Sequence, residues 1–323
     1  MKIINVNEQQ ELVFSDANIP EINEDECLIA VKAIGINRAD LLQRAGKYPP
    51  PAGESLILGI EACGVISKVG TKVSNVDVND NVFALVPGGA YAEFVKVKAN
   101  HLIPLPSNFS FEQGAAIAEV FLTAYQSLFT IAKLQKSDQV LMHGGASGVG
   151  TAAIQLAKAA GAFVTVTVSS ENKAEACIKL GADNVVNYKQ QNIVDWKKQH
   201  LKQGFDVIID IVGGNELQKN IDVVAQDGRL VTLAMLGGRF CEQVDVAKML
   251  LKRVNIHAST LRNRSDQYKQ QLVQDFTEQF YQSLIDGKLQ PVIDTVFSWQ
   301  DADLAHQKMS RNENIGKYIL TVN

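Results

Sequence analysis

A glycine-rich turn is the feature of this sequence that most directly predicts chemistry. Residues 140–142 form a short apolar run typical of a buried strand, and the apolar spacing over 149–160 predicts a helix. Between them stands the pattern Gly145-x-Ser147-x-x-Gly150. In a strand–turn–helix unit, unpaired N–H groups and the positive end of the helix dipole lie at the turn, where they bind a pyrophosphate. The turn therefore indicates a dinucleotide site, with an ordinary strand–helix turn as the alternative.

The residues after the next apolar run, 163–168, indicate which dinucleotide binds. An NAD-preferring site usually places a carboxylate at the end of this strand, where it accepts from the ribose 2′-hydroxyl. Here Ser170 ends the run, and Lys173 follows one helical turn later to meet a 2′-phosphate, unless it only faces solvent. Tyr188 follows the third predicted strand and is placed to pack beside the adenine ribose. We expect NADP rather than NAD, although Glu171 lies near enough to serve the NAD role.

Strands and helices alternate from residue 139 onward, which predicts an α/β domain. The predicted strands are Val140–His143, Phe163–Val168, Asn184–Val186, Val207–Asp210, Leu230–Leu233 and Ile256–Ser259. The predicted helices between them span 149–160, 172–180, 192–202, 216–225 and 244–252. Six strands joined by crossover helices are typical of a doubly wound parallel sheet.

The N-terminal part instead predicts a strand-rich domain, a small barrel or sandwich. Its β-type runs are Leu28–Ala33, Ala62–Val69, Asn81–Val86 and Ala90–Val97. A short helical turn over 37–44 runs into a loop where Pro49, Pro50 and Pro51 exclude helix and central strand. Such a loop either faces a ligand or is plain surface.

The C-terminal part departs from the alternating pattern. Before the alternating region, the pattern of residues 111–133 predicts one helix. Beyond Thr260 the predicted elements are a helix over 266–286, a strand near 295–297, a helix over 300–310 and a strand over 318–322. The last four have no place in a six-stranded sheet, so we expect them to return to the first domain. We therefore predict one domain of residues 1–118 and 262–323, and another of residues 119–261.

The composition is that of an ordinary soluble chain, with 46% hydrophobic and 20% charged residues among 323. Its formal net charge of −4 argues against nucleic acid as a partner. No apolar run reaches the length of a membrane span and the N-terminus is no secretion signal, so we expect no membrane partner. The expected localisation is cytoplasmic.

Residues that could bind a metal or act as nucleophiles are scattered. The four cysteines lie far apart without a C-x-x-C pair: Cys27, Cys63, Cys177 and Cys241. A structural zinc site needs clustered thiolates, so we expect no metal. His143 and Ser147 flank the glycine turn, but Val149 stands where the hydrolase pattern G-x-S-x-G needs its last glycine. We therefore expect no hydrolase and interpret His143 as a strand-end residue packed near the turn.

Four motifs resemble one family. They are the turn over 137–158, the segment 37–53 (NRADLLQRAGKYPPPAG), the tetrapeptide Leu122–Tyr125 and the late tripeptide Ile315–Lys317. On these motifs essentially the whole chain resembles the zinc-free medium-chain dehydrogenases/reductases of the quinone oxidoreductase (zeta-crystallin-like) branch. It is most similar to the p53-inducible quinone oxidoreductase subgroup. It departs from the branch's signature at Ser147, where the signature has glycine.

The resemblance implies a GroES-like catalytic domain, a Rossmann domain, NADPH as cofactor and a homodimer. In zinc-dependent relatives a cysteine ligand stands where this chain has Asn37, and Gly-His-Glu stands where it has Gly59-Ile60-Glu61. Asparagine and isoleucine cannot replace thiolate and imidazole. Because alcohol oxidation through a metal-bound alkoxide needs that Lewis acid, the resemblance implies hydride donation to a quinone or another conjugated carbonyl.

The resemblance also implies roles for single residues. Tyr48 would hydrogen-bond or protonate the developing oxyanion, a contribution of roughly a few kcal/mol, Asn37 would orient the acceptor, and Glu61 would brace the fold. With the residues already named, the expected cofactor-binding set is Thr123, Gly145, Ser147, Gly148, Val149, Gly150, Ser170, Lys173, Tyr188, Leu236, Gly238, Leu261, Asn314 and Lys317.

Two other functions remain open. Reduction of an α,β-unsaturated carbonyl, an alkenal or an enoyl thioester, also puts hydride on an electron-poor conjugated system. The sequence therefore separates it poorly from quinone reduction. From another class, the chain would be a non-catalytic NADPH-binding protein, crystallin-like or regulatory, but the presence of Tyr48 and Asn37 favours an enzyme. The strand Ile256–Ser259 at a sheet edge is a candidate for pairing across a dimer.

Overall fold

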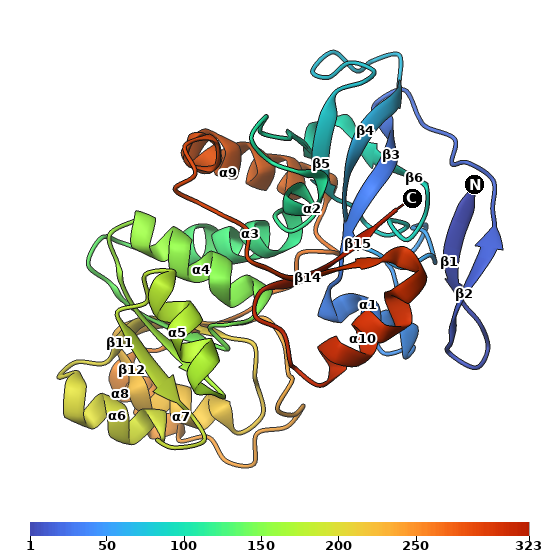
Figure 1. The fold of residues 1–323 in the computed structure, drawn as a ribbon. Helices are drawn as coiled ribbons and strands as arrows, with labels where there is room; N and C mark the ends of the chain where they lie inside the picture. The colour runs from blue at the N-terminus through green and yellow to red at the C-terminus, as the bar shows by residue number, and fades with distance from the viewer. Residues whose placement is uncertain (323) are drawn as a thin grey trace. The chain divides into compact units, whose positions relative to one another are not determined.

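The structure is a computed structural model that describes residues 1–322 (Figure 1). The chain forms two compact units. The first unit holds Met1–Leu122 and the chain from Leu261 onward, and the second unit holds Thr123–Thr260. We describe each unit by itself.

The second unit is built on a parallel six-stranded sheet in the order β10-β9-β8-β11-β12-β13. Its strands are β8 (Gln139–His143), β9 (Phe163–Val168), β10 (Asn184–Asn187), β11 (Phe205–Asp210), β12 (Val224–Thr232) and β13 (Asn255–Ala258). The order reverses between β8 and β11, which confirms the predicted doubly wound fold. In such sheets ligands bind outside the carboxyl ends of the strands at this reversal.

Five helices cross over between these strands. They are α4 (Gly148–Ala159), α5 (Glu171–Lys179), α6 (Ile193–His200), α7 (Glu216–Val223) and α8 (Val246–Lys252). Helices α4 and α5 lie on one side of the strands labelled β11 and β12, and α6, α7 and α8 lie on the other (Figure 1). Both faces of the sheet are thus covered, which is why the central strands β8 and β11 are mostly apolar and buried.

Strand β12 starts at Val224, earlier than the predicted Leu230. Phe205 pairs with Val224, and the register then shifts before Val207 pairs with Arg229. The irregular segment contains Asp227, which has a φ of 59°. Its polar residues interrupt the apolar run, and this interruption hid the start of the strand from the sequence pattern.

The first unit contains a seven-stranded sheet in the order β14-β15-β3-β4-β5-β7, with β6 paired to β3. Its strands are β3 (Glu26–Gly35), β4 (Glu61–Val69), β5 (Asn81–Leu85), β6 (Phe94–Lys98), β7 (Leu102–Pro104), β14 (Ile293–Ser298) and β15 (Lys317–Thr321). Strand β15 runs antiparallel to β3, with Leu320 opposite Ile34. The C-terminal chain therefore returns to the sheet of the N-terminal chain, as the break in pattern after Thr260 indicates.

The remaining elements surround this sheet. A separate hairpin pairs β1 (Lys2–Val6) with β2 (Leu12–Asp16). The helices are α1 (Arg38–Arg44), α2 (Phe111–Gly114), α9 (Asp266–Ile285) and α10 (Ala302–Ser310), with 3₁₀ turns η1 (Ala99–His101) and η3 (Trp299–Asp301). No helix or strand is described between α1 and β4, as the three prolines predict.

Two sequence expectations for the first unit were wrong in detail. The run Ala90–Val97 forms a strand only from Phe94, because the N–H of Tyr91 donates to Leu58 and its carbonyl accepts from Ile4. The helix expected over 111–133 is three pieces: α2, then α3 (Ala118–Tyr125), then the π-helical η2 (Gln126–Ile131).

The same stretch also corrects the expectation about membrane spans. Within residues 1–322 one helical stretch, Phe111–Ile131, is long and apolar enough to cross a membrane by length and composition alone. In the structure 78% of its most apolar window is buried inside the protein. Burial of this kind is what a core helix shows.

Candidate functional site

The glycine-rich turn forms a cradle of backbone N–H groups at the start of α4. Ser147 is the N-cap residue, and its Oγ accepts from the N–H of Gly150 at 3.0 Å. Its own N–H donates to the carbonyl of Gly144 at 2.9 Å. Among the described residues the N–H groups of Gly148 and Val149 have no acceptor, and both residues are partly exposed. Two free donors at a helix N-terminus fit one pyrophosphate.

The small residues of the cradle are required by its packing. A Cβ on Gly145 would lie 2.5 Å from the Val166 side chain on β9, and one on Gly150 would lie 2.4 Å from the carbonyl oxygen of Gly144. Both distances are far below van der Waals contact, so larger residues would push the turn and the helix apart. The residues therefore fit a dinucleotide phosphate, as the fingerprint predicts.

Ser147 departs from the fingerprint without a conformational cost. Its φ is −69° and its ψ is 165°, an extended conformation that any L-residue adopts. Glycine is therefore not required here by the backbone, and serine adds a cap worth about 1 kcal/mol. This explains how a serine stands at the middle position of the pattern.

A chain of buried hydrogen bonds supports the cradle from below. Thr167 Oγ1 accepts from the N–H of Gly144 at 3.2 Å and lies 3.1 Å from His143 Nδ1. His143 Nε2 lies 2.7 Å from Asn220 Oδ1, and Asn220 Nδ2 donates to Asp210 Oδ2 at 3.0 Å. Since Asn220 must donate to the carboxylate, its oxygen accepts from His143, which fixes the Nε2–H tautomer. We call these four side chains the cradle relay.

The relay connects three strand ends at the reversal of the sheet. His143 ends β8, Thr167 precedes the end of β9 and Asp210 ends β11. Asp210 Oδ1 also accepts from the N–H groups of Val212 at 2.7 Å and Gly213 at 3.0 Å. The relay therefore holds the cradle and the loop after β11 in one arrangement.

The loop that holds Leu236 and Gly238, two of the predicted cofactor-binding residues, lies beside the loop after β11. Gly238 forms a parallel bridge with Gly213, and the N–H of Gly237 donates to Val212 at 2.7 Å. Gly238 has a φ of 144°, which only glycine adopts readily. Leu236 is half-exposed on this loop. The roles of Leu236 and Gly238 toward the cofactor stay predictions.

The residues predicted to choose the dinucleotide lie at one edge of the sheet. Asn187 at the end of β10 pairs with Val168 at the end of β9, and the N–H of Tyr188 donates to Val168 at 3.1 Å. Ser170 is the N-cap residue of α5, and Lys173 lies in the first turn of that helix. The structure thus brings Tyr188, Ser170 and Lys173 to the same carboxyl edge.

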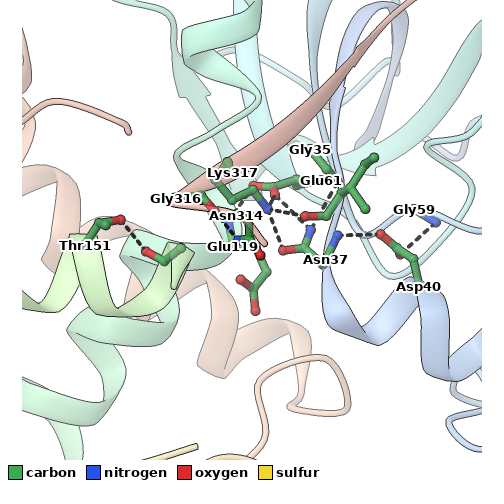
Figure 2. A network of polar contacts seen from close by, with 12 residues as sticks. Gly35, Asn37, Asp40, Gly59, Glu61, Glu119, Thr151, Asn314, Gly316 and Lys317 are labelled. Carbon is green, nitrogen blue, oxygen red and sulfur yellow. Dashed lines mark hydrogen bonds and ion pairs between the residues drawn. The ribbon is translucent and has the colours of Figure 1, made fainter. Parts of the chain in front are cut away.

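A buried polar cluster in the first unit lies where the resemblance places zinc ligands (Figure 2). The Lys317 ammonium donates to Ile36 O at 2.8 Å, to Asn37 Oδ1 at 2.6 Å and to the Glu61 carboxylate. Asn37 Nδ2 donates to Glu61 Oε1 at 2.8 Å, and Glu61 Oε2 accepts from the N–H of Glu119 at 2.9 Å. The Lys317 side chain is 4% exposed and that of Glu61 is fully buried. A cation therefore already occupies the space between Asn37 and Glu61.

These bonds bear on three sequence expectations. Glu61 braces the fold through three partners, as expected. Asn37 also donates to Gly35 O at 3.2 Å, so its amide nitrogen and oxygen are both used within the cluster. Lys317 uses its ammonium on three acceptors. We predict that Asn37 contacts the acceptor and that Lys317 contacts the cofactor. Both stay predictions, and the bonds within the cluster do not favour them.

Asp40 connects the cluster to a second buried chain. Its carboxylate accepts from the N–H of Asn37 at 2.8 Å and from that of Gly59 at 3.2 Å. The Tyr91 hydroxyl lies 2.8 Å from His306 Nε2, and burial together with the nearby Asp40 carboxylate raises the pKa of Tyr91. Burial raises the pKa of Asp40 to about 7 and lowers the pKa of His306 to about 3. At neutral pH His306 is therefore neutral, and Asp40 is partly protonated.

Tyr48 lies on the proline loop beside an arginine. The Cζ atom of Arg262 is 5.7 Å from the centroid of the Tyr48 ring. Burial raises the pKa of Tyr48, so its phenol remains protonated and able to donate at neutral pH. Of the other candidates in this unit, Asn314 donates to Gly316 O at 2.6 Å and Leu261 is buried. Thr123, the first residue of the second unit, is also buried.

No metal-binding set is present among residues 1–322, where no group of three or more His, Cys, Asp or Glu could hold an ion. Within segment 59–61 the central residue is Ile60, which has no donor atom. The side chains that could ligate a metal near Asn37 are instead bonded to Lys317.

The comparisons with known proteins cover both units. The profile of the alcohol dehydrogenase GroES-like domain matches residues 23–107, and that of the zinc-binding dehydrogenases matches residues 148–278. The quinone oxidoreductase of Mus musculus is 30% identical over 311 residues, which cover 95% of this chain and 92% of that protein. This chain belongs to the quinone oxidoreductase type of medium-chain dehydrogenases/reductases. As a member of this NAD(P)-using family, it is an oxidoreductase.

Other relatives of this quinone oxidoreductase-type protein differ in length and description. The synaptic vesicle membrane protein VAT-1 homolog of Danio rerio is 30% identical over 315 residues, but this chain spans 65% of its length. The Escherichia coli quinone oxidoreductase, solved in complex with NADPH, has a TM-score of 0.87 at 27% identity over 99% of each chain. The CurK enoyl reductase has a TM-score of 0.86 at 26% identity, covering 100% of this chain and 99% of that one.

Several polar residues of this family member were missed by the sequence reasoning. Asn220 and Asp210 of the cradle relay stand far from the glycine turn in the sequence, as do Tyr91 and His306 from Asp40. Arg262 directly follows Leu261, a predicted cofactor-binding residue, but it belongs to none of the motifs described above. Only the position of Asp210 at a strand end could have drawn attention to it, because carboxyl ends of parallel strands carry functional side chains.

Proposed function

We propose that this oxidoreductase transfers hydride from NADPH to a quinone without a metal ion. Bound NADPH would supply the hydride, so a quinone gaining that hydride and one proton from solvent becomes a hydroquinone. The free N–H groups of Gly148 and Val149 would bind the pyrophosphate, and the relay beneath them would keep the cradle rigid. The half-exposed loop with Leu236 and Gly238 would pass along the nicotinamide.

The observation that carries the proposal is the Lys317 ammonium within the Asn37–Glu61 pair (Figure 2). Zinc-dependent relatives need metal ligands at these positions. Here Asn37 stands in place of one ligand, and the Glu61 carboxylate is paired with the Lys317 ammonium. A carbonyl that needs polarisation by a Lewis acid would find no such group beside Asn37 and Glu61. An acceptor that is already electrophilic, such as a quinone, needs none.

The preference for NADPH rests on the edge formed by β9 and β10. Ser170 and Lys173 offer a hydroxyl and a cation to a 2′-phosphate, and the 59%-exposed Tyr188 offers a ring to the ribose. Glu171 is the competing group, and its carboxylate accepts from Gln190 at 3.3 Å. This bond directs Glu171 toward Gln190, which lies two residues after Tyr188. Its carboxylate is therefore engaged elsewhere, which supports NADPH over NADH.

Within the acceptor site Tyr48 is the proposed donor to the developing oxyanion. Its raised pKa keeps the proton in place until the oxygen gains charge. Asn37 holds the cluster with Lys317 and Glu61, and in this proposal it shapes the site rather than donating to the acceptor.

Reduction of a conjugated enone or enoyl thioester is the second candidate, supported by the likeness to CurK enoyl reductase. The test is steady-state oxidation of NADPH and of NADH with 1,4-benzoquinone, 9,10-phenanthrenequinone, a 2-alkenal and a crotonyl thioester. We expect the highest kcat/KM for NADPH with a quinone. Higher kcat/KM on the thioester would favour the second candidate, and tight NADPH binding without turnover would favour a non-catalytic binding protein.

We also propose a cytoplasmic homodimer that pairs through β13. This strand is an end strand of its sheet and has β12 as its neighbour. Exposed apolar side chains lie close by in sequence, with Phe240, Leu250 and Leu251 all more than 70% exposed. A paired edge would cover such groups. Light scattering should give twice the chain mass, and Leu250→Asp with Leu251→Asp should give the monomer; monomeric wild-type protein contradicts the proposal.

A further inference from the structure

Arg262 is a buried cation with most of its hydrogen bonds unmade. The residue is 5% exposed, and its Nε donates to the carbonyl oxygen of Pro87 at 2.8 Å. Its Nη1 and Nη2 atoms are buried and have no partner within the described chain. Lys317 is the instructive contrast, because it is equally buried but has an acceptor for each ammonium N–H. A buried charge without such partners is unfavourable, so this guanidinium needs a counter-group that residues 1–322 do not supply.

The guanidinium is held in a fixed orientation. The bond to Pro87 directs the Nε edge toward the loop after β5, which leaves the two Nη atoms pointing elsewhere. Gly88 keeps that loop close, since a Cβ there would lie 3.2 Å from Nη2 and 2.9 Å from Ser55 O. The Tyr48 ring lies on another side, 5.7 Å from Cζ. A pre-oriented pair of N–H donors is therefore presented next to the proposed oxyanion donor.

The nearby acidic groups do not neutralise this charge. Asp40 is near enough to act on Arg262 electrostatically, but its carboxylate accepts from the N–H groups of Asn37 and Gly59. Burial also raises the pKa of Asp40 to about 7, so its negative charge is incomplete at neutral pH. Glu54 also acts on Arg262 electrostatically, but it is an exposed residue, so solvent screens its charge. The charge balance around Arg262 therefore favours an anionic ligand.

We propose that Arg262 binds a carboxylate of the acceptor, so that the preferred substrates are conjugated carbonyl compounds that carry a carboxylate group. The two oxygens of a carboxylate match the paired Nη donors of a guanidinium. This inference rests on the proposed function, because it places the acceptor against Tyr48. As in the proposed function, the acceptor gains one hydride from NADPH and one proton from solvent. A quinone then becomes a hydroquinone, an enone becomes the saturated carbonyl compound, and NADP⁺ is released.

The test compares 3-benzoylacrylate with its methyl ester, which share one conjugated enone and differ in charge. Full-length wild-type protein should show a higher kcat/KM for the acid than for the ester. Arg262→Met should lower the acid-to-ester ratio by about 10- to 100-fold, the effect of losing a charge-assisted hydrogen bond. Arg262→Lys should keep part of the ratio, and the exposed neighbour Arg264, changed to Met, should leave it unchanged.

Binding measurements keep the test independent of turnover and of folding. By calorimetry without cofactor, 3-benzoylacrylate should bind the wild type more tightly than the ester does, and Arg262→Met should remove this difference. Because the substitution deletes an unpaired buried charge, Arg262→Met should not lower Tm. An unchanged acid-to-ester ratio, or weaker NADPH binding with an unchanged ratio, would overturn the proposal. If the enzyme turns over only the ester, this inference is overturned and the proposed function stays intact. If the protein turns over no acceptor but still binds the acid selectively, only the proposed function is overturned.

Discussion

The ammonium nitrogen of Lys317 lies 2.6 Å from the side-chain oxygen of Asn37, although 280 positions separate the two residues. The contact exists because β15 runs antiparallel to β3 and brings the C-terminal chain to the end of that strand. The ammonium also bonds to the Glu61 carboxylate, so Lys317, Asn37 and Glu61 form one buried cluster. The proposed hydride transfer without a metal ion rests on this cluster.

Breaking this ion pair should destabilise the first unit strongly. Lys317→Met leaves the Glu61 carboxylate buried with one cation fewer, and we expect the free energy of unfolding to fall by about 3–5 kcal/mol. Adding Glu61→Gln should recover part of the loss, because the uncompensated charge is removed. Urea denaturation measures both. Lys288→Met, whose side chain is 72% exposed, should change stability by less than about 0.5 kcal/mol; a similarly small effect of Lys317→Met would contradict the account.

Asp40 and His306 should give opposite dependences of stability on pH. Folded Asp40 keeps its proton up to about pH 7, whereas the unfolded residue releases it near 3.8, so its contribution falls as pH rises through this range. His306 behaves in the reverse sense: the unfolded imidazole binds a proton below 6.5 and the folded one only below about 3, so its contribution rises with pH. Each slope is at most about 1.4 kcal/mol per pH unit.

Single variants should separate the two slopes. Relative to wild type between pH 4.5 and 6.5, Asp40→Asn should make the free energy of unfolding rise more steeply with pH, and His306→Gln should make it rise less or fall. Urea titrations at four pH values measure the difference. If both variants run parallel to wild type, neither residue has the shifted pKa assigned to it.

The Ser147 cap should matter for stability more than for cofactor binding. Ser147→Ala removes the acceptor of the Gly150 N–H and should cost about 1 kcal/mol, while Ser147→Gly should cost a few tenths. Neither change touches the free N–H groups of Gly148 and Val149. Fluorescence titration should therefore give NADPH dissociation constants within about threefold of wild type, since phosphate affinity there comes from the backbone. A loss of NADPH affinity above tenfold in Ser147→Gly would mean that the serine itself binds the phosphate.

The cradle relay should affect the cofactor more than the acceptor. Asn220→Leu leaves His143 Nε2 and Asp210 Oδ2 without their partner and should lower stability by at least about 2 kcal/mol. Because the relay holds the cradle loop, KM for NADPH should rise more than KM for the quinone. The exposed residue Asn100, changed to Leu, is the matched control with no expected effect on either constant. Equal changes in both KM values would reduce the relay to a purely structural role.

The elements of the second unit could be predicted from the sequence because their signals are local. Apolar runs such as 163–168 and the glycine turn before α4 each lie within one short window. Strand β12 was misplaced only where polar residues near Asp227 interrupt the run. The hairpin β1–β2 was missed, since β2 is largely exposed and β1 buries two consecutive residues, Ile3 and Ile4, rather than alternate ones.

The polar clusters could not be predicted in the same way. The bond between Lys317 and Glu61 joins residues 256 positions apart, and that between Tyr91 and His306 joins residues 215 apart. Their pairing depends on strand order and register, which no local pattern encodes. The resemblance implied a role for Asn37 at the acceptor and for Lys317 at the cofactor. Only the fold shows that these two residues contact each other.

Hydride transfer by metal-stripped enzyme tests the central claim most directly. The full chain is treated with a strong chelator, checked for residual zinc, and assayed for NADPH oxidation with 1,4-benzoquinone before and after. The account predicts the same rate within twofold in both samples, and no increase on adding zinc. Activity that disappears with the chelator and returns with zinc would contradict it.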